Sequence, residues 1–541
     1  MSKHLVRFLI CLVLALLILP ALACDDDDDD DDDNNDNDTG APGDDDDDDD
    51  NDDDNDDDDT STDDDTSTDD DTSTDDDTAT DDDDDDTAPP ADDFLAAWPQ
   101  NPNEAQDYDE NPDAGTMRLK AGDYDVWHRL WHQPDKGGTV ETAFTDGTRT
   151  EIDHHGGWGD STIWTGTYLA SQAMRYYVTG DAQAKANAIR SAEALHGYLH
   201  VNGVTGFISR YWGSQDYDKT YQGDEWCDAQ GRCHHVESGD YAGDFWWGET
   251  SRDQYTGWFF GLCMTYDLVD DEPTRQMIRE DMVEVLHTLM DQNWMILDEE
   301  GAPTDAAPNV MPPFRLAWLL VGYHITGDET IKAELQSWLL NGNRLVLQLA
   351  SLGWMNRYSQ HYGLNLGHTN WYGILRLGRA YMSDDDYQFM VKLFEDQLHN
   401  HVRLQHNAWF NGVHMSQGDY VPSKDDENLA QLIEDLTDFR DAPNVRYHLP
   451  ERTCELDPVS VFLADLMDEY PFLADLIGNV ERQCAEAFTV QEQCTTDFLW
   501  QRNAWEFQEC GNDDPAFVNP GADYLVAYWL ASYHKFVDKT F

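Results

Sequence analysis

The chain has 541 residues and a formal net charge of −80, from 112 acidic and 32 basic side chains. Of the aspartates, 42 lie in residues 25–93, yet the 448 residues that follow still carry a net charge of about −40. Such a surface repels polyphosphate, which argues against nucleic acid as a partner. Those 448 residues suffice for one large core or two ordinary domains.

The N-terminus predicts a secretory signal, because Lys3 and Arg7 precede an apolar run that leads to Ala23 and Cys24. This arrangement resembles a bacterial lipoprotein signal, although Ala21 stands where that family usually has leucine. The resemblance implies cleavage of residues 1–23, a lipid on Cys24, and export to a bacterial membrane, on its periplasmic side or at the cell surface. An ordinary cleaved signal is the alternative. The apolar run is too short for the ~20 residues of a membrane span.

Residues 24–93 are nearly all Asp, Thr, Ser and Asn, and part of the segment repeats TSTDDD. A segment without apolar residues to bury and with charges that repel one another predicts a disordered, extended tether. A calcium-binding tract is the alternative, but no loop pattern there fixes a coordination shell.

Seven cysteines follow the tether, and an exported protein can pair them in disulfides. Cys227 and Cys233 bracket the short polar loop CDAQGRC, so we predict a bridge between them. Cys263 lies in an apolar helical pattern and is expected to be buried and unpaired. The remaining four could form two further bridges: Cys454, Cys484, Cys494 and Cys510.

From Ser161 onward the dominant pattern is helical, and one unit recurs. An apolar, aromatic helix ends near a tyrosine, an aspartate follows five residues later, and a more polar helix begins. The first helix should be buried, the second should face water, and the aspartate should lie near its N-cap. The unit recurs at Tyr176–Asp181, Tyr266–Asp271, Tyr323–Asp328, Tyr381–Asp386 and Tyr533–Asp538.

The stretches SRDQYTGWFFGLCMTYDLVDD, HTNWYGILRLGRAYM and PGADYLVAYWLASYH resemble the six-hairpin glycosidase-like superfamily. The resemblance covers roughly Ser161 to Phe541 and implies an all-α fold, an (α/α) toroid of helical hairpins with long connecting loops. We place this toroid domain at residues 94–541, with an irregular, cysteine-containing region at about 420–502. An open α-solenoid is the structural alternative. Members of the superfamily include glycoside hydrolases, polysaccharide lyases and sugar epimerases.

In such a ring, the loops that lead into the inner helices should carry the site. The first loop, DHHGGWGD, offers Asp160 as a carboxylate and Trp158 as a stacking surface for a sugar ring. The alternative is an N-cap for Asp160 and rim packing for Trp158. The second loop, FWWGETSRDQ, offers two carboxylates, Glu249 and Asp253, beside Trp247 and Arg252. A carboxyl group among aromatic rings can act as a general acid, whereas the alternative is a capping cluster.

The third loop, RYSQHYGLNLGHTNWYG, supplies groups that a lyase needs as base and acid, namely His361, Tyr362 and His368. Binding residues are expected from the same loop and from scattered positions elsewhere. They are Asn365, Asn370, Trp371, Arg210, His414 and Arg502. The alternative is that the polar residues of the third loop are satisfied within the core.

The sequence therefore predicts an exported, lipid-anchored carbohydrate-active protein that binds a polysaccharide or oligosaccharide and contacts the membrane through the lipid on Cys24. Within this prediction, hydrolysis by Asp160 and Asp253 and elimination by His361 or His368 with Tyr362 both stay open. A toroid that only binds glycan or protein is the alternative. No cofactor or metal is expected, since the adjacent pairs His154–His155 and His234–His235 lack the spacing of metal ligands.

Overall fold

The computed structural model describes residues 114–304, 311–340, 343–350, 361–417, 426–446, 453–471, 480–493, 500, 502–506 and 514–537. All of them belong to one of the two compact units into which the chain divides. The predicted signal, Cys24 and the tether lie outside the described residues.

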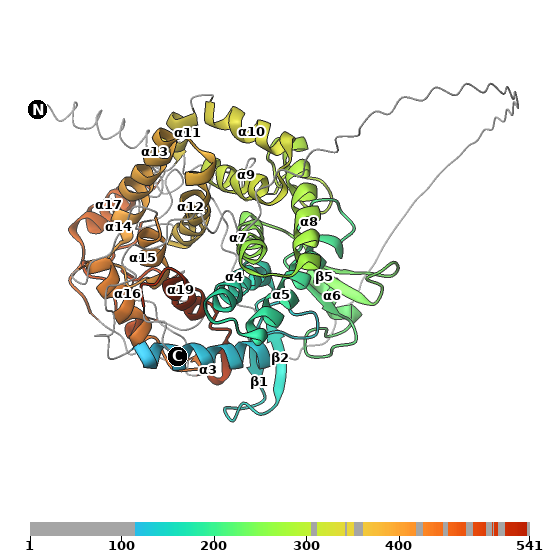
Figure 1. Cartoon of the computed structure of the whole chain (residues 1–541). Coiled ribbons are helices and arrows are strands. Elements are labelled where there is room, and N and C mark those ends of the chain that lie inside the picture. Colours follow the sequence, from blue (N-terminus) through green and yellow to red (C-terminus); the bar gives the residue numbers. More distant parts are fainter. Residues whose placement is uncertain are drawn as a thin grey trace, which may run out of the picture. The chain divides into compact units, whose positions relative to one another are not determined.

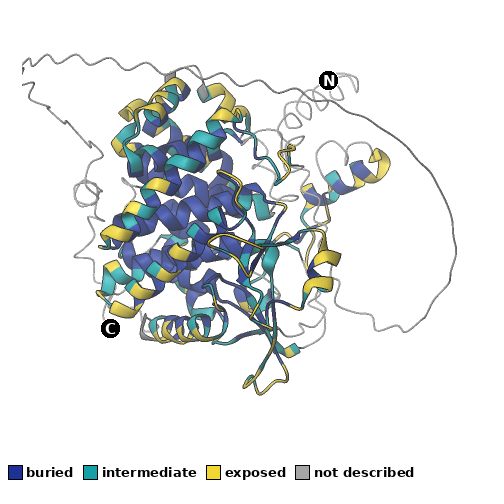
Figure 2. Ribbon diagram, turned by 90° about the vertical axis from the view of Figure 1, so that its right-hand side faces the viewer, coloured by how far each residue is buried: buried dark blue, intermediate teal, exposed yellow. Residues whose placement is uncertain are grey.

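Six apolar helices lie at the centre of the described part (Figure 1). Successive helices of this inner row contact each other, and the last contacts the first. Nearly all of their side chains are buried, as the dark interior of Figure 2 shows. The inner helices are α4 (Ser161–Thr179), α7 (Arg252–Leu268), α9 (Pro312–Thr326), α12 (His361–Tyr381), α15 (Ala408–Met415) and α19 (Ala522–Tyr533).

An outer row of amphipathic helices packs against the inner row (Figure 1). Five of its members each follow an inner helix in the chain and pack on it. The sixth, α3, precedes every other described helix and packs on α19, the last one. The outer helices are α3 (Ala114–Trp131), α5 (Ala182–His200), α8 (Glu272–Asp291), α10 (Glu329–Leu340), α13 (Asp384–Phe394) and α16 (Glu427–Asp438).

The tyrosine-to-aspartate unit marks the turn from an inner to an outer helix. Asp181 and Asp271 are the N-caps of α5 and α8, and each side chain accepts a backbone hydrogen bond. Asp328 accepts two such bonds at the start of α10. In the fourth unit Ser383 caps α13 and Asp386 lies in the first turn, so the predicted capping aspartate is displaced by three residues. The fifth aspartate lies outside the described residues.

The innermost packing depends on glycines where α4 crosses α7. A methyl group added at Gly166 would lie 1.9 Å from the carbonyl oxygen of Gly257, and one at Gly257 would lie 2.3 Å from the Cα of Ile163. Real side chains never approach so closely, so only glycine lets the two backbones pack together. These two positions set the distance between two helices of the inner row.

The prediction of a purely α fold is wrong, because the described part contains two small antiparallel sheets. One sheet has the order β2-β1-β7-β6 and the other β3-β5-β4. Their strands are only three to six residues long, too short for alternation of polar and apolar residues to stand out in the sequence. The strands are β1 (Glu141–Phe144), β2 (Ile152–Gly156), β3 (Tyr211–Ser214), β4 (Cys233–His235), β5 (Asp244–Trp247), β6 (Asn444–Arg446) and β7 (Asp514–Asn519). All seven lie in the connections that lead from an outer helix into the next inner one.

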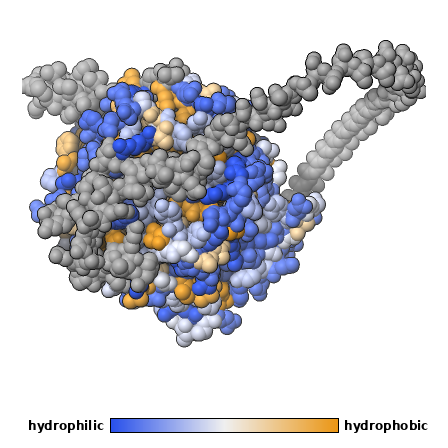
Figure 3. All heavy atoms as spheres, in the orientation of Figure 1, coloured by the Kyte–Doolittle hydropathy of each residue, from blue (hydrophilic) through white to orange (hydrophobic). Residues whose placement is uncertain are grey.

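Short helical segments complete the description: η4 (Trp158–Asp160), α6 (Asp224–Gln230), α11 (Asn343–Ala350), the π-helix η6 (Glu395–His399), α14 (Asn400–Val402), α17 (Pro458–Glu469) and η8 (Val490–Glu492). None of the helices in the described ranges combines the length and apolar character that a membrane crossing requires. On the face drawn in Figure 3, the coloured residues are mostly hydrophilic, with scattered apolar ones among them.

The predicted disulfide between Cys227 and Cys233 is confirmed. A second bridge joins Cys454 to Cys484, which is one of the pairings that the sequence left open. Cys263 is buried and free, as predicted. The other two C-terminal cysteines, Cys494 and Cys510, lie outside the described residues.

Candidate active site

Three inner helices, α4, α7 and α12, begin close together, and we call this end of the inner row the mouth. Asp160 is the residue before α4, Asp253 is the second residue of α7, and Tyr362 is the second residue of α12. The Tyr362 hydroxyl donates a short hydrogen bond to Oδ2 of Asp253. Burial raises the pKa of Tyr362 well above its ordinary value, and the negative charges of Asp253 and Asp160 raise it further. The phenol of Tyr362 is therefore bonded to one carboxylate and feels the charge of the other.

Arg210 joins the loops that carry the two carboxylates. Its guanidinium donates to the carbonyl oxygen of Gly159 over 2.7 Å and also to that of Glu249. Its Nη1 lies 4.0 Å from Oδ1 of Asp160. The backbone of Arg210 bonds to Trp247 and continues the sheet of β3 and β5, which fixes the position of the side chain. We call Asp160, Arg210, Asp253 and Tyr362 together the mouth cluster.

The mouth cluster is accessible from solvent. The side chains of Asp160 and Arg210 are 36% and 19% exposed, and Asp253 and Tyr362 are half-buried. Although Asp160 occupies the N-cap position of α4, its side chain makes no capping hydrogen bond. The alternative interpretation of Asp160, as a residue whose side chain caps α4, therefore has no support in the geometry.

A small cavity lies among the inner helices, lined by residues from the N-terminal halves of α4, α12, α15 and α19 and by Phe260 of α7. Asn365, one turn after Tyr362 on α12, and Trp164, one turn after Asp160 on α4, both line it. The Asn365 side-chain oxygen and the Trp164 indole nitrogen are buried without a hydrogen-bond partner among the described residues. Buried polar groups normally have partners, so these two atoms are suited to bind a water molecule in this small cavity. The other lining residues are Ile163, Thr167, Thr369, Trp409 and Val526.

Trp158 lies beside the mouth but packs within an aromatic group. Its ring centroid lies 5.0 to 5.8 Å from those of Tyr211, Trp226, Phe245 and Trp247. Trp158 and Trp247 are half-buried, so part of each ring remains exposed. Rim packing, which the sequence left as an alternative for Trp158, is what the geometry shows.

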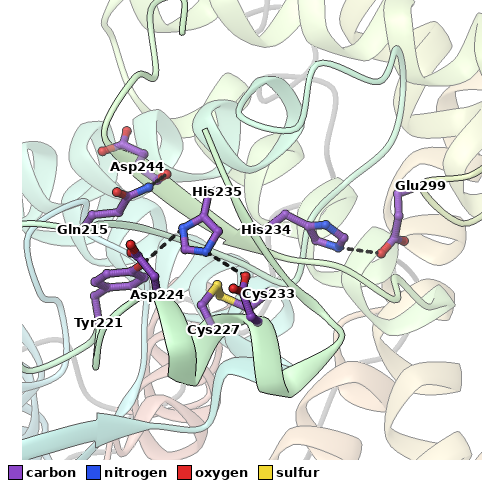
Figure 4. Close-up of a disulfide and its surroundings, with 10 residues drawn as sticks. Gln215, Tyr221, Asp224, Cys227, Cys233, His234, His235, Asp244 and Glu299 are labelled. Carbon is purple, nitrogen blue, oxygen red and sulfur yellow. Dashed lines mark hydrogen bonds and ion pairs between the residues drawn. A yellow bond between two sulfur atoms is a disulfide. The ribbon is translucent and has the colours of Figure 1, made fainter. Parts of the chain in front are cut away.

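The neighbouring disulfide holds α6 against β4 (Figure 4). In the same region, Nδ1 of His235 and the hydroxyl of Tyr221 share a hydrogen bond of 3.1 Å. Nε2 of His234 lies 3.0 Å from Oε1 of Glu299. Cys227 and Cys233 thus stabilise the support under the aromatic group, since Trp226 directly precedes one of them.

Two predicted residues of the second loop are not members of the mouth cluster, although the backbone oxygen of Glu249 accepts from Arg210. Glu249 directs its carboxylate at Arg232, 2.5 Å away, and is mostly exposed. Arg252 is buried at the start of α7. Gln254 also takes part in the site, because its amide donates to the same Gly159 oxygen that Arg210 contacts.

Several predicted site residues of α12 and α15 are packed in the core. His368 is fully buried and stacks on Phe410 with ring centroids 3.7 Å apart. His414 is buried and stacks on His399 at 4.0 Å. For these positions the core interpretation, which the sequence left open for the third loop, agrees better with the structure.

Of the remaining predicted site residues, two are buried in the core, one is half-buried, and one has a side chain outside the described part. Asn370 is buried and donates to Thr256 of α7, so it links two inner helices. Trp371 is fully buried. The side chain of His361 lies outside the described part of the chain. Arg502 is half-buried in a short segment whose Trp500 donates to the carbonyl oxygen of Asp523 at the start of α19.

Sequence reasoning missed Trp164 and most of the cavity lining. The available signal was helical spacing, because Trp164 follows Asp160 by four residues and therefore shares its helix face. With the geometry established, comparisons of the chain with family models, curated proteins and solved structures found no match.

Proposed function

We propose that this chain is an exported, lipid-anchored carbohydrate-active enzyme with an (α/α) toroid fold, and that its mouth cluster hydrolyses a glycosidic bond. The closed series of contacts from α4 through α19 and back to α4 supports the toroid. The small sheets belong to the connections of this ring. Export and the anchor rest on the sequence around Cys24 alone.

The observation that carries the proposal is the placement of two carboxylates, from Asp160 and Asp253, at an accessible opening where Arg210 links their loops and Tyr362 bonds to Asp253. Glycoside hydrolysis ordinarily uses two carboxyl groups, one as acid and one as base or nucleophile.

The contacts distinguish the roles of the two carboxylates. Tyr362 donates to Asp253, and a donor stabilises the ionised form of a carboxylate. Asp253 is therefore suited to be the base or nucleophile. Oδ1 of Asp160 lies 4.0 Å from Nη1 of Arg210, and the Asp160 side chain is 36% exposed. We assign the role of general acid to Asp160, because the reaction needs a second carboxyl group beside the base or nucleophile.

Hydrolysis fits these residues better than elimination from a uronic-acid polymer. The raised pKa keeps Tyr362 neutral at pH 7, so the phenol is a poor base for removing a sugar proton. His368, the other candidate base, is buried against Phe410. A net charge of about −40 on residues 94–541 would also repel a polyanionic substrate. A neutral or weakly charged glycan is the substrate class that we infer.

A panel of polysaccharides tests the proposal, with new reducing ends and unsaturated uronate absorbance measured in parallel. On the best substrate, Asp253→Asn and Asp160→Asn should each lower kcat by at least about 100-fold. Tyr362→Phe should shift the acid limb of the pH–rate profile upward, because Asp253 loses a donor that stabilises its ionised form. Asp153→Asn, an exposed carboxylate paired with His154 in the same loop, is the matched control and should leave kcat unchanged.

Two results would contradict hydrolysis. Unsaturated-uronate absorbance that grows in step with the new reducing ends would indicate elimination, because each bond that a lyase cleaves yields one of each. Glycan binding that is unaffected by Asp253→Asn, with no turnover in the wild type on any substrate, would indicate a binding protein instead.

A further inference from the structure

We propose that His196, His200 and Asp281 form a site for a divalent transition-metal ion, zinc above all, that links α5 to α8. The proposal is independent of the mouth cluster. It concerns two outer helices that lie side by side in Figure 1 and contact each other.

The two histidines share one face of α5. They are four residues apart, which places them one helical turn apart, and their ring centroids are separated by 4.3 Å. The stretch HGYLH thus has the spacing that the adjacent histidine pairs elsewhere in the chain lack. A pair with this spacing on a regular helix can direct two imidazole nitrogens at a single point.

Asp281 of α8 completes the set. Nδ1 of His196 lies 2.9 and 2.8 Å from its two carboxylate oxygens, and Nε2 of His200 lies 2.9 Å from Oδ1. One donor atom from each residue falls within 4.8 Å of the others. Within the described ranges, this is the one group of histidine, cysteine or acidic side chains with three converging donor atoms.

Imidazole nitrogen and carboxylate oxygen are ligands that zinc prefers, at about 2.0–2.2 Å and with tetrahedral geometry. Ligand atoms at the corners of such a tetrahedron are roughly 3.3 Å apart. The present distances of 2.8–2.9 Å from the imidazole nitrogens to the carboxylate oxygens would need to widen by only a few tenths of an ångström. The metal would replace the protons that now lie between imidazole and carboxylate, as metal binding to histidine ordinarily requires.

Burial and exposure also suit a metal site. The side chain of Asp281 is only 3% exposed, so its carboxylate is already largely removed from water. His196 and His200 are 37% and 29% exposed, which leaves a path to solvent and room for a water molecule as the fourth ligand. The strongly acidic chain concentrates cations near its surface.

The competing interpretation is that the same side chains form only hydrogen bonds between the two helices. Other histidine–carboxylate pairs in the described part serve that purpose with one imidazole each. His287 of α8, for example, pairs with Asp328 at 3.3 Å. A second imidazole converging on one buried carboxylate distinguishes the proposed site from this pair.

The test uses the full-length protein, stripped with a chelator and titrated calorimetrically with zinc chloride. Millimolar magnesium is included to occupy carboxylates outside the site, because magnesium prefers all-oxygen ligands and zinc prefers imidazole. We expect one tight zinc ion per chain and a rise in Tm on its addition. Cobalt(II) should give the visible spectrum of a tetrahedral site without thiolate charge-transfer bands.

His200→Gln and Asp281→Asn should each abolish the stoichiometric binding, whereas the matched control His287→Gln should retain it. Circular dichroism of the metal-free proteins establishes that each variant is folded. No stoichiometric binding by the wild type in magnesium would overturn the proposal, whatever the variants do. Unchanged binding by folded His200→Gln or Asp281→Asn would overturn it as well.

Discussion

At the residue scale, the most heavily buried charges lie near the opposite ends of the inner helices from the mouth. Asp267 of α7 accepts from His324 of α9 at 2.6 Å and pairs with Arg376 of α12 at 2.5 Å. Their side chains are at most 1% exposed. Burial alone would raise the pKa of Asp267, but His324 and Arg376 lower it, and the net shift is downward. The carboxylate is thus held ionised inside the ring.

We predict that Asp267→Asn lowers the free energy of unfolding by about 3–5 kcal/mol, because it leaves the Arg376 charge buried without its counter-ion. Asp270→Asn removes an exposed carboxylate that pairs with Lys185 and should cost no more than about 1 kcal/mol. Urea denaturation measures both. Since the pKa of Asp267 is depressed on folding, its contribution is complete above pH ~4 and is lost only as the pH falls further. Equal costs for the two variants would contradict the assignment.

A second buried pair has the opposite pH dependence. Burial raises the pKa of Asp435 to about 7, although a 2.8 Å hydrogen bond from His406 opposes the shift. The pKa of His406 is raised too, since burial is outweighed by its bond to Asp435. Groups whose pKa is higher in the folded state stabilise it at low pH and lose that effect as the pH rises.

Between about pH 5 and pH 8, the wild type should therefore lose stability relative to Asp435→Asn, which has no proton to release there. Chemical denaturation at several pH values gives the difference directly. A difference that does not change with pH, or that grows in favour of the wild type as the pH rises, would show that Asp435 is ionised throughout.

At the scale of elements, the crossing of α4 and α7 leaves no space for a side chain at Gly257. We predict that Gly257→Ala separates the two helices and costs at least about 1–3 kcal/mol. Gly373→Ala on α12 is the control, because a methyl group there would meet its nearest neighbours only at 3.9 and 4.0 Å. That substitution should be neutral or stabilising, since alanine favours helix. Thermal unfolding of both variants provides the measurement, and a neutral Gly257→Ala would mean that the helices can shift apart freely.

The elements also show what the sequence could predict. Asp181 and Asp271 could be identified as N-caps from their spacing. Each follows its tyrosine by five residues, which leaves room for only one tight turn between the two helices. The pairing of α3 with α19 could not, because the partners are separated by most of the chain and α3 lacks the repeated unit. The strands were missed because three to six residues carry too little periodicity.

The candidate site also has features that the sequence could predict and contacts that it could not. Asp160 and Asp253 could be placed at one end of the ring from the direction of their helices. The bond from Tyr362 to Asp253 joins residues 109 positions apart. Arg210 bonds to backbone oxygens 51 and 39 positions away, in the two loops that carry the carboxylates, so only the tertiary structure reveals these links.

At the scale of the whole molecule, the excess of about 40 negative charges in residues 94–541 opposes compaction. We predict that Tm rises as sodium chloride is increased from about 0.05 to 0.5 M, because salt screens the repulsion between surface carboxylates. A protein lacking residues 25–93 should show the same rise and a similar Tm, since those residues have almost no apolar surface to pack. Differential scanning calorimetry tests both statements. A salt effect that disappears with the deletion would place the repulsion in the Asp-rich segment.

The packing of α3 on α19 has a consequence for synthesis of the protein. The ribosome makes α3 before every other described helix and α19 after all of them, so α3 waits for its main partner, and α4 for one of its neighbours, until the last described helix has been made. A chain that stops before Ala522 leaves the apolar faces of α3, α4 and α15 uncovered. Chaperones and proteases recognise such surfaces, so premature termination products are distinguishable from the complete chain without any dedicated degradation signal.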